Sequence, residues 1–127
     1  MDINREIAEK VMGWNYYASE GGGLCWVDIK GNFTYPVNHP KYFEGVQDKL
    51  RSFIPFNPAE RIDHAFEVRD KIKAMPIGAQ VAFRVSLIKI IANKMRLTCR
   101  EVEHSAEIIM HIEPEDICLA ALEAVKE

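Results

Sequence analysis

The pattern of apolar positions predicts helices near both ends of the chain and in its middle, separated by strands. Asp2 is suited to capping a first helix, in which the apolar residues of 3–14 recur at helical spacing. The segments 24–29 and 33–37 are rich in aromatic and β-branched residues, and they flank a Lys-Gly-Asn turn sequence at 30–32. This arrangement predicts a β-hairpin.

Two helices are predicted in the middle of the chain. The first is a short helix over 41–53. The second has Asn57 suited to the N-cap, Pro58 at the first helical position and Glu60 at the third. Apolar residues within 62–72 then recur at steps of three and four, which predicts a core stripe. The Pro and Gly that follow are expected to end this helix.

Strands are predicted in the next part of the chain. Residues 81–87 alternate between apolar and small or polar side chains, which is typical of a strand with one apolar face. A turn is expected at 92–94, where Asn93 is suited to a positive φ. Two further strands are expected over 95–103 and 106–112.

The last helix is expected to begin at the acidic sequence 113–116, because acids favour the first turn of a helix. Residues 117–122 are apolar nearly all round, so this helix must be buried on more than one side. The whole pattern predicts a single α+β domain over 1–127. We expect a central, mainly antiparallel sheet of about five strands with helices on both faces.

Composition places the chain among ordinary globular proteins, with 127 residues of which 48% are hydrophobic and 28% charged. No apolar run is long enough to span a bilayer, and the charged start of the chain lacks a secretion signal. The three cysteines are odd in number and widely spaced, as expected of reduced thiols. We therefore expect a cytoplasmic protein that does not associate with membranes.

The net charge of −3 is unevenly distributed along the chain. Residues 71–100 hold seven bases and no acid, whereas 101–127 hold eight acids and one base. The basic segment can attract a small anion, while the overall negative charge disfavours binding of duplex nucleic acid. The alternative is that the two segments neutralise each other across neighbouring strands.

The sequence lacks the phosphate-loop, dinucleotide-binding and nucleophile-elbow motifs. Three glycines at 21–23 can expose amides to a phosphate, but a flexible connector explains them better because no lysine flanks them. The histidines and cysteines have no zinc-ligand spacing, so no metal is expected. His64 is expected on a solvated helix face and Cys118 in the core. With no catalytic set and no cofactor motif, the sequence favours a protein that is not an enzyme.

A few residues of the basic segment are suited to binding a nucleotide. Phe83 and Arg84 are adjacent on the predicted strand, and Asn93 lies at its far turn. Nucleotide ligands commonly use an aromatic ring for stacking, an Asn for the base edge and basic side chains for phosphate. The available phosphate partners are Arg84, Lys89, Lys94, Arg96 and Arg100. Core packing is the alternative role for Phe83.

Three segments resemble those of one protein family: REIAEKVMGW at 5–14, IDHAFEVRDKI at 62–72 and EPEDICLAALEAVKE at 113–127. They look like the small phage and prophage proteins of the phage α-β-α (ABA) sandwich family. The resemblance implies an α-β-α sandwich. One departure is Ala65-Phe66, where Ala-Trp is expected, and it keeps an aromatic residue.

The chain is also similar to the Thoeris anti-defence sponge proteins, which are of similar size and phage origin. That resemblance implies binding of glycocyclic ADP-ribose, the signal made by bacterial TIR enzymes, without cleavage. It also implies binding of the cyclic di- or trinucleotides of CBASS defence, assembly as a homo-oligomer and action in the host bacterial cytoplasm. The stacking aromatic of those proteins would fall on Phe83, and their ligand-contacting Asn on Asn93.

The leading hypothesis is therefore a decoy that sequesters nucleotide immune signals. One small domain supplies few walls for a charged ligand, so we expect a pocket near a subunit interface, with Arg61 or Arg69 contributed by a neighbour. The expected ligand-binding residues are Phe83, Asn93, Arg84, Lys94, Arg96 and Arg61. The alternatives are a non-catalytic phage structural or adaptor protein that docks a protein partner through its apolar helix and acidic end, and a small nucleotide-cleaving enzyme.

Overall fold

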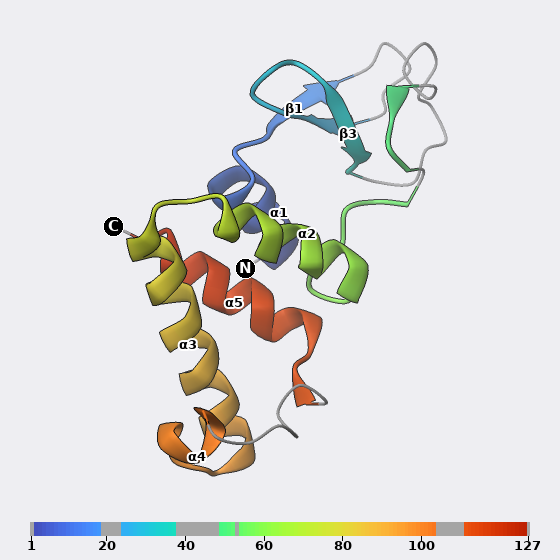
Figure 1. Cartoon of the computed structure of the whole chain (residues 1–127). Coiled ribbons are helices and arrows are strands. Elements are labelled where there is room, and N and C mark those ends of the chain that lie inside the picture. Colours follow the sequence, from blue (N-terminus) through green and yellow to red (C-terminus); the bar gives the residue numbers. More distant parts are fainter. Residues whose placement is uncertain (1, 19–23, 38–48, 53, 104–110, 127) are drawn as a thin grey trace.

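The computed structural model describes residues 2–18, 24–37, 49–52, 54–103 and 111–126. In Figure 1 the three strands lie at one end of the molecule, with the helices below them and α4 at the far end. These elements confirm the α+β class and the antiparallel sheet. In chain order they are α1 (Ile3–Glu6), the π-helix η1 (Ile7–Val11), β1 (Asn15–Ala18), β2 (Leu24–Val27), β3 (Phe33–Pro36), α2 (Ile62–Lys73), α3 (Ile77–Met95), α4 (Cys99–Glu103) and α5 (Pro114–Ala124).

The N-terminal helix forms where the sequence predicts it, but it ends at Val11, so Trp14 lies beyond the helix rather than on its apolar face. The Asp2 carboxylate accepts a hydrogen bond from the Arg5 amide at 3.2 Å and so caps α1. The apolar face of α1 and η1 then buries Ile7 and Val11 in the core. The helical region ends before Trp14, because Gly13 adopts a φ of 73° and turns the chain into β1.

The sheet has the order β1-β2-β3, and both pairs are antiparallel. The predicted hairpin of β2 and β3 is confirmed. Its turn is closed by a hydrogen bond from the Gly31 amide to the Asp28 carbonyl at 3.0 Å, and Gly31 adopts the φ of 86° that the turn requires. Strand β1, which was not predicted, places Tyr16 opposite Trp26 with the two rings stacked at 4.2 Å.

The start of α2 differs from the prediction that Asn57 caps it. The helix begins at Ile62 with Arg61 at the N-cap, and residues 58–60 form a separate turn. The Asn57 side chain is held elsewhere: its oxygen accepts from the Asn4 amide at 2.9 Å, while its own amide donates to a Glu60 carboxylate oxygen at 3.2 Å. A contact between distant segments therefore replaces the expected local cap.

The strand predicted over 81–87 and the turn predicted at 92–94 are both wrong, because the whole segment is the helix α3. From Phe83 onward, apolar residues also recur at every fourth position, which fits a helix. The packing of α3 against α5 and α4 favours this helical spacing. The left-handed residue that ends the helix is Arg96, with a φ of 55°, rather than Asn93.

The strand predicted over 95–103 is also wrong, since its second half is the helix α4. The Thr98 hydroxyl accepts from the Glu101 amide and a Glu101 carboxylate oxygen accepts from the Thr98 amide, each at 3.1 Å. This reciprocal cap starts the helix locally. Three strands are thus described rather than five; residues 106–110 of the last expected strand, and most of the expected helix over 41–53, lie outside the described residues.

The final helix forms where the acidic sequence predicts it. Glu113 and Asp116 make a capping box at the start of α5. Beyond it Ile117 and Cys118 are buried, as the apolar sequence requires, and burial raises the pKa of the Cys118 thiol to about 12. Helix α5 packs against α2, α3 and η1, so it lies at the centre of the helical layer. The packing of α2, α3 and α5 leaves a hollow between these three helices.

Candidate ligand-binding site

An apolar hollow of about 380 Å³ opens between α2, α3 and α5. Two of its wall residues are phenylalanines and one is an arginine, while the others are aliphatic. We call it the aromatic hollow; it is lined by Ile62, Phe66, Arg69, Phe83, Leu87, Ile112 and Ile117. A hollow of this size and composition is typical of a site that binds a small molecule through its apolar part.

The polar group of the aromatic hollow is the Arg69 guanidinium. It lies over the Phe66 ring, 4.3 Å from the ring centroid, in a cation–π arrangement. It also donates to an Asp70 carboxylate oxygen at 3.2 Å, although the Arg69 side chain remains 38% exposed. Phe66 is itself 41% exposed. A stacked aromatic and guanidinium pair therefore stands at the opening, accessible to a ligand.

A buried carboxylate joins α3 and α5 beside the aromatic hollow. The Asp116 carboxylate accepts from the Lys94 ammonium at 2.8 Å and from the Glu113 amide at 3.0 Å. These bonds join the end of α3 to the start of α5, next to Ile117. Phe83 reaches the hollow from the other end of α3 and also packs against the main core. Both roles considered for Phe83, core packing and ligand access, are thus available to the same side chain.

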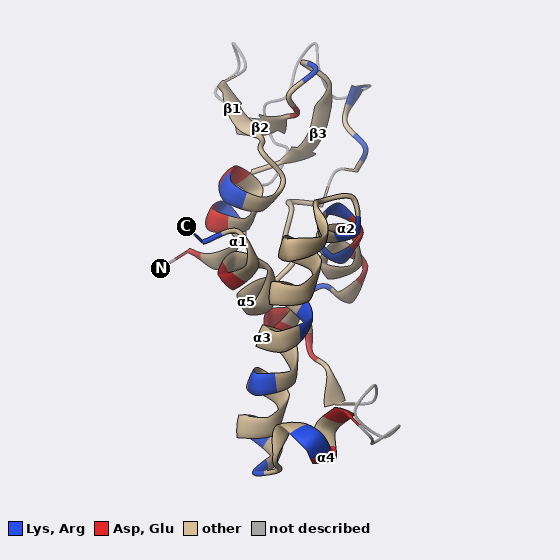
Figure 2. Ribbon diagram, turned by 60° about the vertical axis from the view of Figure 1, so that its left-hand side comes forward, with Lys and Arg blue, Asp and Glu red and all other residues tan. Residues whose placement is uncertain are grey.

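The structure does not bring Phe83 and Asn93 together within one chain. Both lie on α3, ten residues apart, so they are separated by about 15 Å along the helix axis and by about 80° around it. Asn93 and Arg84 are exposed on α3 and do not line the aromatic hollow. Basic positions along α3 are blue in Figure 2.

The other expected phosphate partners also do not line the aromatic hollow. Lys94 is paired with Asp116 and lies 3.7 Å from a Glu113 oxygen, and the hydrogen bond to Asp116 raises its pKa. Arg96 is exposed beyond the end of α3, and Arg61 donates to Asp63 at 3.2 Å before α2. At Lys94 the basic and acidic segments do neutralise each other, although between two helices rather than two strands.

Sequence reasoning named part of the aromatic hollow and missed the rest. The core stripe predicted within 62–72 comprises Ile62, Ala65, Phe66, Arg69 and Ile72, and the structure divides it between two faces. Ile62, Phe66 and Arg69 form a wall of the hollow. Ala65 and Ile72 are buried, as predicted. Arg69 was expected to reach a neighbour's pocket. The signal in the sequence was Phe66 followed three residues later by Arg69, a spacing that brings the two side chains together on one helix face.

His64 was expected on a solvated face, and this is wrong because it is 4% exposed. Its Nδ1 accepts a hydrogen bond from the Asn57 amide at 2.9 Å, and its ring lies 4.8 Å from that of Tyr35 and 5.5 Å from that of Phe56. Burial lowers the pKa of His64. The residue therefore acts as a neutral acceptor inside the core, where it fixes the chain before α2.

Within the described ranges, no group of three or more His, Cys, Asp and Glu residues is arranged to hold a metal ion. Over the same part of the chain, every helix is too short or too polar to cross a membrane.

The family model of the phage ABA sandwich domain matches residues 5–122, which is most of the chain. The chain belongs to this family. No curated protein and no solved structure matches it. The family match confirms the resemblance carried by the three sequence segments and the sandwich class of the fold.

Proposed function

We propose that this phage ABA sandwich protein binds a nucleotide-derived small molecule in the aromatic hollow and holds it without cleavage. One observation carries the proposal: Phe66 and Phe83 line the same hollow as Arg69, whose guanidinium lies over the Phe66 ring. A planar base can stack on such rings, while the guanidinium binds phosphate oxygens. Binding of this kind requires apolar walls and a cation, and it does not require a catalytic group.

At the finer level, we propose that the ligand is an immune signal of the bacterial host. The candidates are glycocyclic ADP-ribose and, as a second class, the cyclic di- and trinucleotides. Membership of a phage family supports a role against the host, because a phage gains from removing a defence signal. The hollow of about 380 Å³ suits the base and ribose of such a ligand, and its remaining phosphates would lie outside.

We further propose that the protein works as a homo-oligomer. Asn93, Arg84 and Arg96 of one chain do not line its own aromatic hollow, so a second copy is needed to bring them to a bound ligand. An apolar stripe on α3, formed by Ile77, Val81 and Val85, supports association because it is 44–73% exposed.

The test begins with thermal shifts of the protein against glycocyclic ADP-ribose isomers, ADP-ribose, NAD and cyclic di- and trinucleotides. Each stabilised sample is then heated and its released nucleotide is identified by chromatography. We expect a large shift with one class of ligand, which is recovered intact. An altered ligand would show an enzyme instead, and no shift across the panel would contradict nucleotide binding.

Variants then place the ligand in the aromatic hollow. Phe66→Ala and Arg69→Gln each change a partly exposed side chain, so the fold should survive, and each should weaken binding about tenfold or more. Lys73→Gln removes the same charge from an exposed position of the same helix outside the hollow and serves as the control. Equal affinity of the three variants and the unchanged protein would contradict the placement of the ligand.

A second candidate function is the adaptor role. Its expected docking element, the apolar final helix, buries Ile117 and Cys118 but leaves Leu119 and Leu122 half-buried at a hollow beside η1. The exposed stripe of Ile77, Val81 and Val85 on α3 is a further observation that favours a protein partner. A protein that binds none of the nucleotides but retains a defined phage or host protein through this stripe would establish the adaptor role.

A further inference from the structure

A second hollow, of about 330 Å³, opens between the β2–β3 turn and α2. Three basic side chains from three separate segments line it: Lys30 in the turn, Arg51 after β3 and Lys71 near the end of α2. Met12 and Trp14 form part of its apolar wall. We call it the basic pocket. It was not expected from the sequence, where these three bases are far apart.

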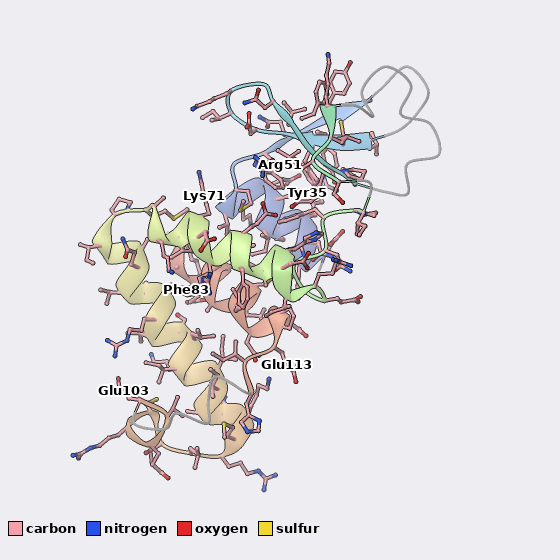
Figure 3. The ribbon with its side chains drawn as sticks, turned by 45° about the vertical axis from the view of Figure 1, so that its right-hand side comes forward. Tyr35, Arg51, Lys71, Phe83, Glu103 and Glu113 are labelled. Atoms are coloured by element: carbon pink, nitrogen blue, oxygen red, sulfur yellow. The ribbon has the colours of Figure 1, made fainter. Side chains whose placement is uncertain are left out.

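The basic pocket and the aromatic hollow lie on opposite sides of α2. On this helix Phe66 and Arg69 face the aromatic hollow, whereas Lys71 is separated from them by about 140° and about 160° around the helix axis. Figure 3 shows Arg51 and Lys71 between α2 and the sheet, while Phe83 lies on the other side of α2. A ligand in one site therefore does not fill the other.

Lys30 is presented by a fixed turn. The Asp28 carboxylate accepts from the backbone amides of Lys30 and Asn32, each at 2.9 Å. These bonds occupy the one acid that lines the pocket, and the amide of Asn32 is the main cause of its lowered pKa. Hydrogen bonds therefore hold the turn, and the Asp28 carboxylate is bonded to the backbone amides of the turn rather than to the lysines.

Arg51 is oriented by α2. Its guanidinium donates to a Glu67 carboxylate oxygen at 3.3 Å, and the other Glu67 oxygen accepts from the Tyr35 hydroxyl. Among the ion pairs of the described residues, none involves Lys30 or Lys71. As far as the described residues show, the pocket therefore holds two lysines without an acidic partner beside a guanidinium that is already held in place.

From this arrangement we propose that the basic pocket binds the phosphoryl group of a small molecule. Arg51 has the planar donors that match phosphate oxygens, and the two lysines add point charges from the turn and from α2. The proposal goes beyond the ligand of the aromatic hollow and does not depend on it, because the two sites share no lining residue.

Sodium pyrophosphate is the probe for the test, added to ¹⁵N-labelled protein at constant ionic strength and followed by amide NMR. Saturable shifts are expected at Lys30, Gly31 and Lys71. Lys30→Gln and Lys71→Gln should each weaken binding about five- to tenfold. Lys73→Gln is the matched control, since it removes the same charge from the same helix outside the basic pocket.

Two results would overturn the proposal. One is the absence of saturable shifts up to about 10 mM pyrophosphate. A weak specific site has a dissociation constant of about 1 mM and would be nearly saturated at that concentration. The other is an equal loss in Lys73→Gln and Lys71→Gln, which would show only a general effect of charge. Pyrophosphate binding that persists in Phe66→Ala separates this site from the aromatic hollow, and its loss there would contradict two independent sites.

A parallel titration with ADP identifies the source of the phosphoryl group. Tighter binding of ADP than of pyrophosphate supports a nucleotide whose phosphates enter the pocket, with its apolar part against Met12 and Trp14. Equal or weaker binding of ADP supports a free inorganic anion. In either case the shifts must follow the two lysines.

Discussion

At the scale of single residues, His64 makes the stability of this protein depend on pH. It is buried as a neutral ring whose Nδ1 accepts the Asn57 amide, and burial lowers its pKa below that of the unfolded chain. The unfolded state therefore binds more protons in the range between the two values. The stability contribution is present above the unfolded pKa of about 6.5 and is lost as the pH falls through that range toward the folded value.

We predict that the melting temperature falls as the pH is lowered from 7.5 to 5.5. The free energy of unfolding should fall by up to about 1.4 kcal/mol for each unit by which the pKa of His64 differs between the folded and unfolded states. In His64→Gln the protein should melt lower at pH 7.5 and lose much of this dependence. His111→Gln changes an exposed histidine and should behave like the unchanged protein. Thermal unfolding monitored by circular dichroism at three pH values checks this, and parallel curves for unchanged protein and His64→Gln would contradict it.

At the scale of elements, the junction of α3 and α5 depends on one buried carboxylate. Asp116 is 4% exposed, completes the capping box of α5 and accepts from Lys94 of α3. We predict that Asp116→Ala lowers the free energy of unfolding by about 2 kcal/mol, because the cap and the ion pair are lost together. Glu115→Ala removes a neighbouring exposed acid and should change it by less than about 0.5 kcal/mol. Urea unfolding measures both, and equal losses would contradict the role of Asp116.

The elements also show which parts of the fold the sequence predicts. The first helix, the hairpin and α5 carry local signals, namely the Asp2 cap, the turn around Gly31 and the acids before Ile117. For α3 the same apolar residues fit alternation and a four-residue period, so local sequence did not distinguish strand from helix. For α4 a local signal exists in the pair of Thr98 and Glu101, and the predicted strand over 95–103 did not take it into account.

At the scale of the whole molecule, the candidate site could be predicted only in part because its residues come from three helices. Phe83 was named from its residue type, and it does line the aromatic hollow. Arg69 of α2 and Ile112, which lies just before α5, join it only through the packing of α2 and α5 around α3, which no local pattern contains. The basic pocket is a stronger case, since Lys30 and Lys71 meet only after the sheet docks on α2.

The exposed stripe on α3 leads to a prediction about assembly. The stripe consists of Ile77, Val81 and Val85 and continues at helical spacing to Ile88. Helix α4 covers this face only near Ile88, toward the C-terminal end of α3. The uncovered upper part is apolar and 44–73% exposed, which is costly for a chain that remains alone in water. A second copy of the same chain is the partner that we propose for it.

We predict that the protein is a dimer or larger in light scattering coupled to size-exclusion chromatography, and that Val81→Glu converts it to the monomer. The reason is that a carboxylate in the middle of the stripe must be desolvated on association, without a partner for its charge. Ile29→Glu introduces the same charge at an exposed apolar residue of the turn between β2 and β3, which is not part of the stripe, and should leave the assembly unchanged. A monomeric unchanged protein that still binds a nucleotide would show that one chain is sufficient for the site, and Asn93 would then have no role in it.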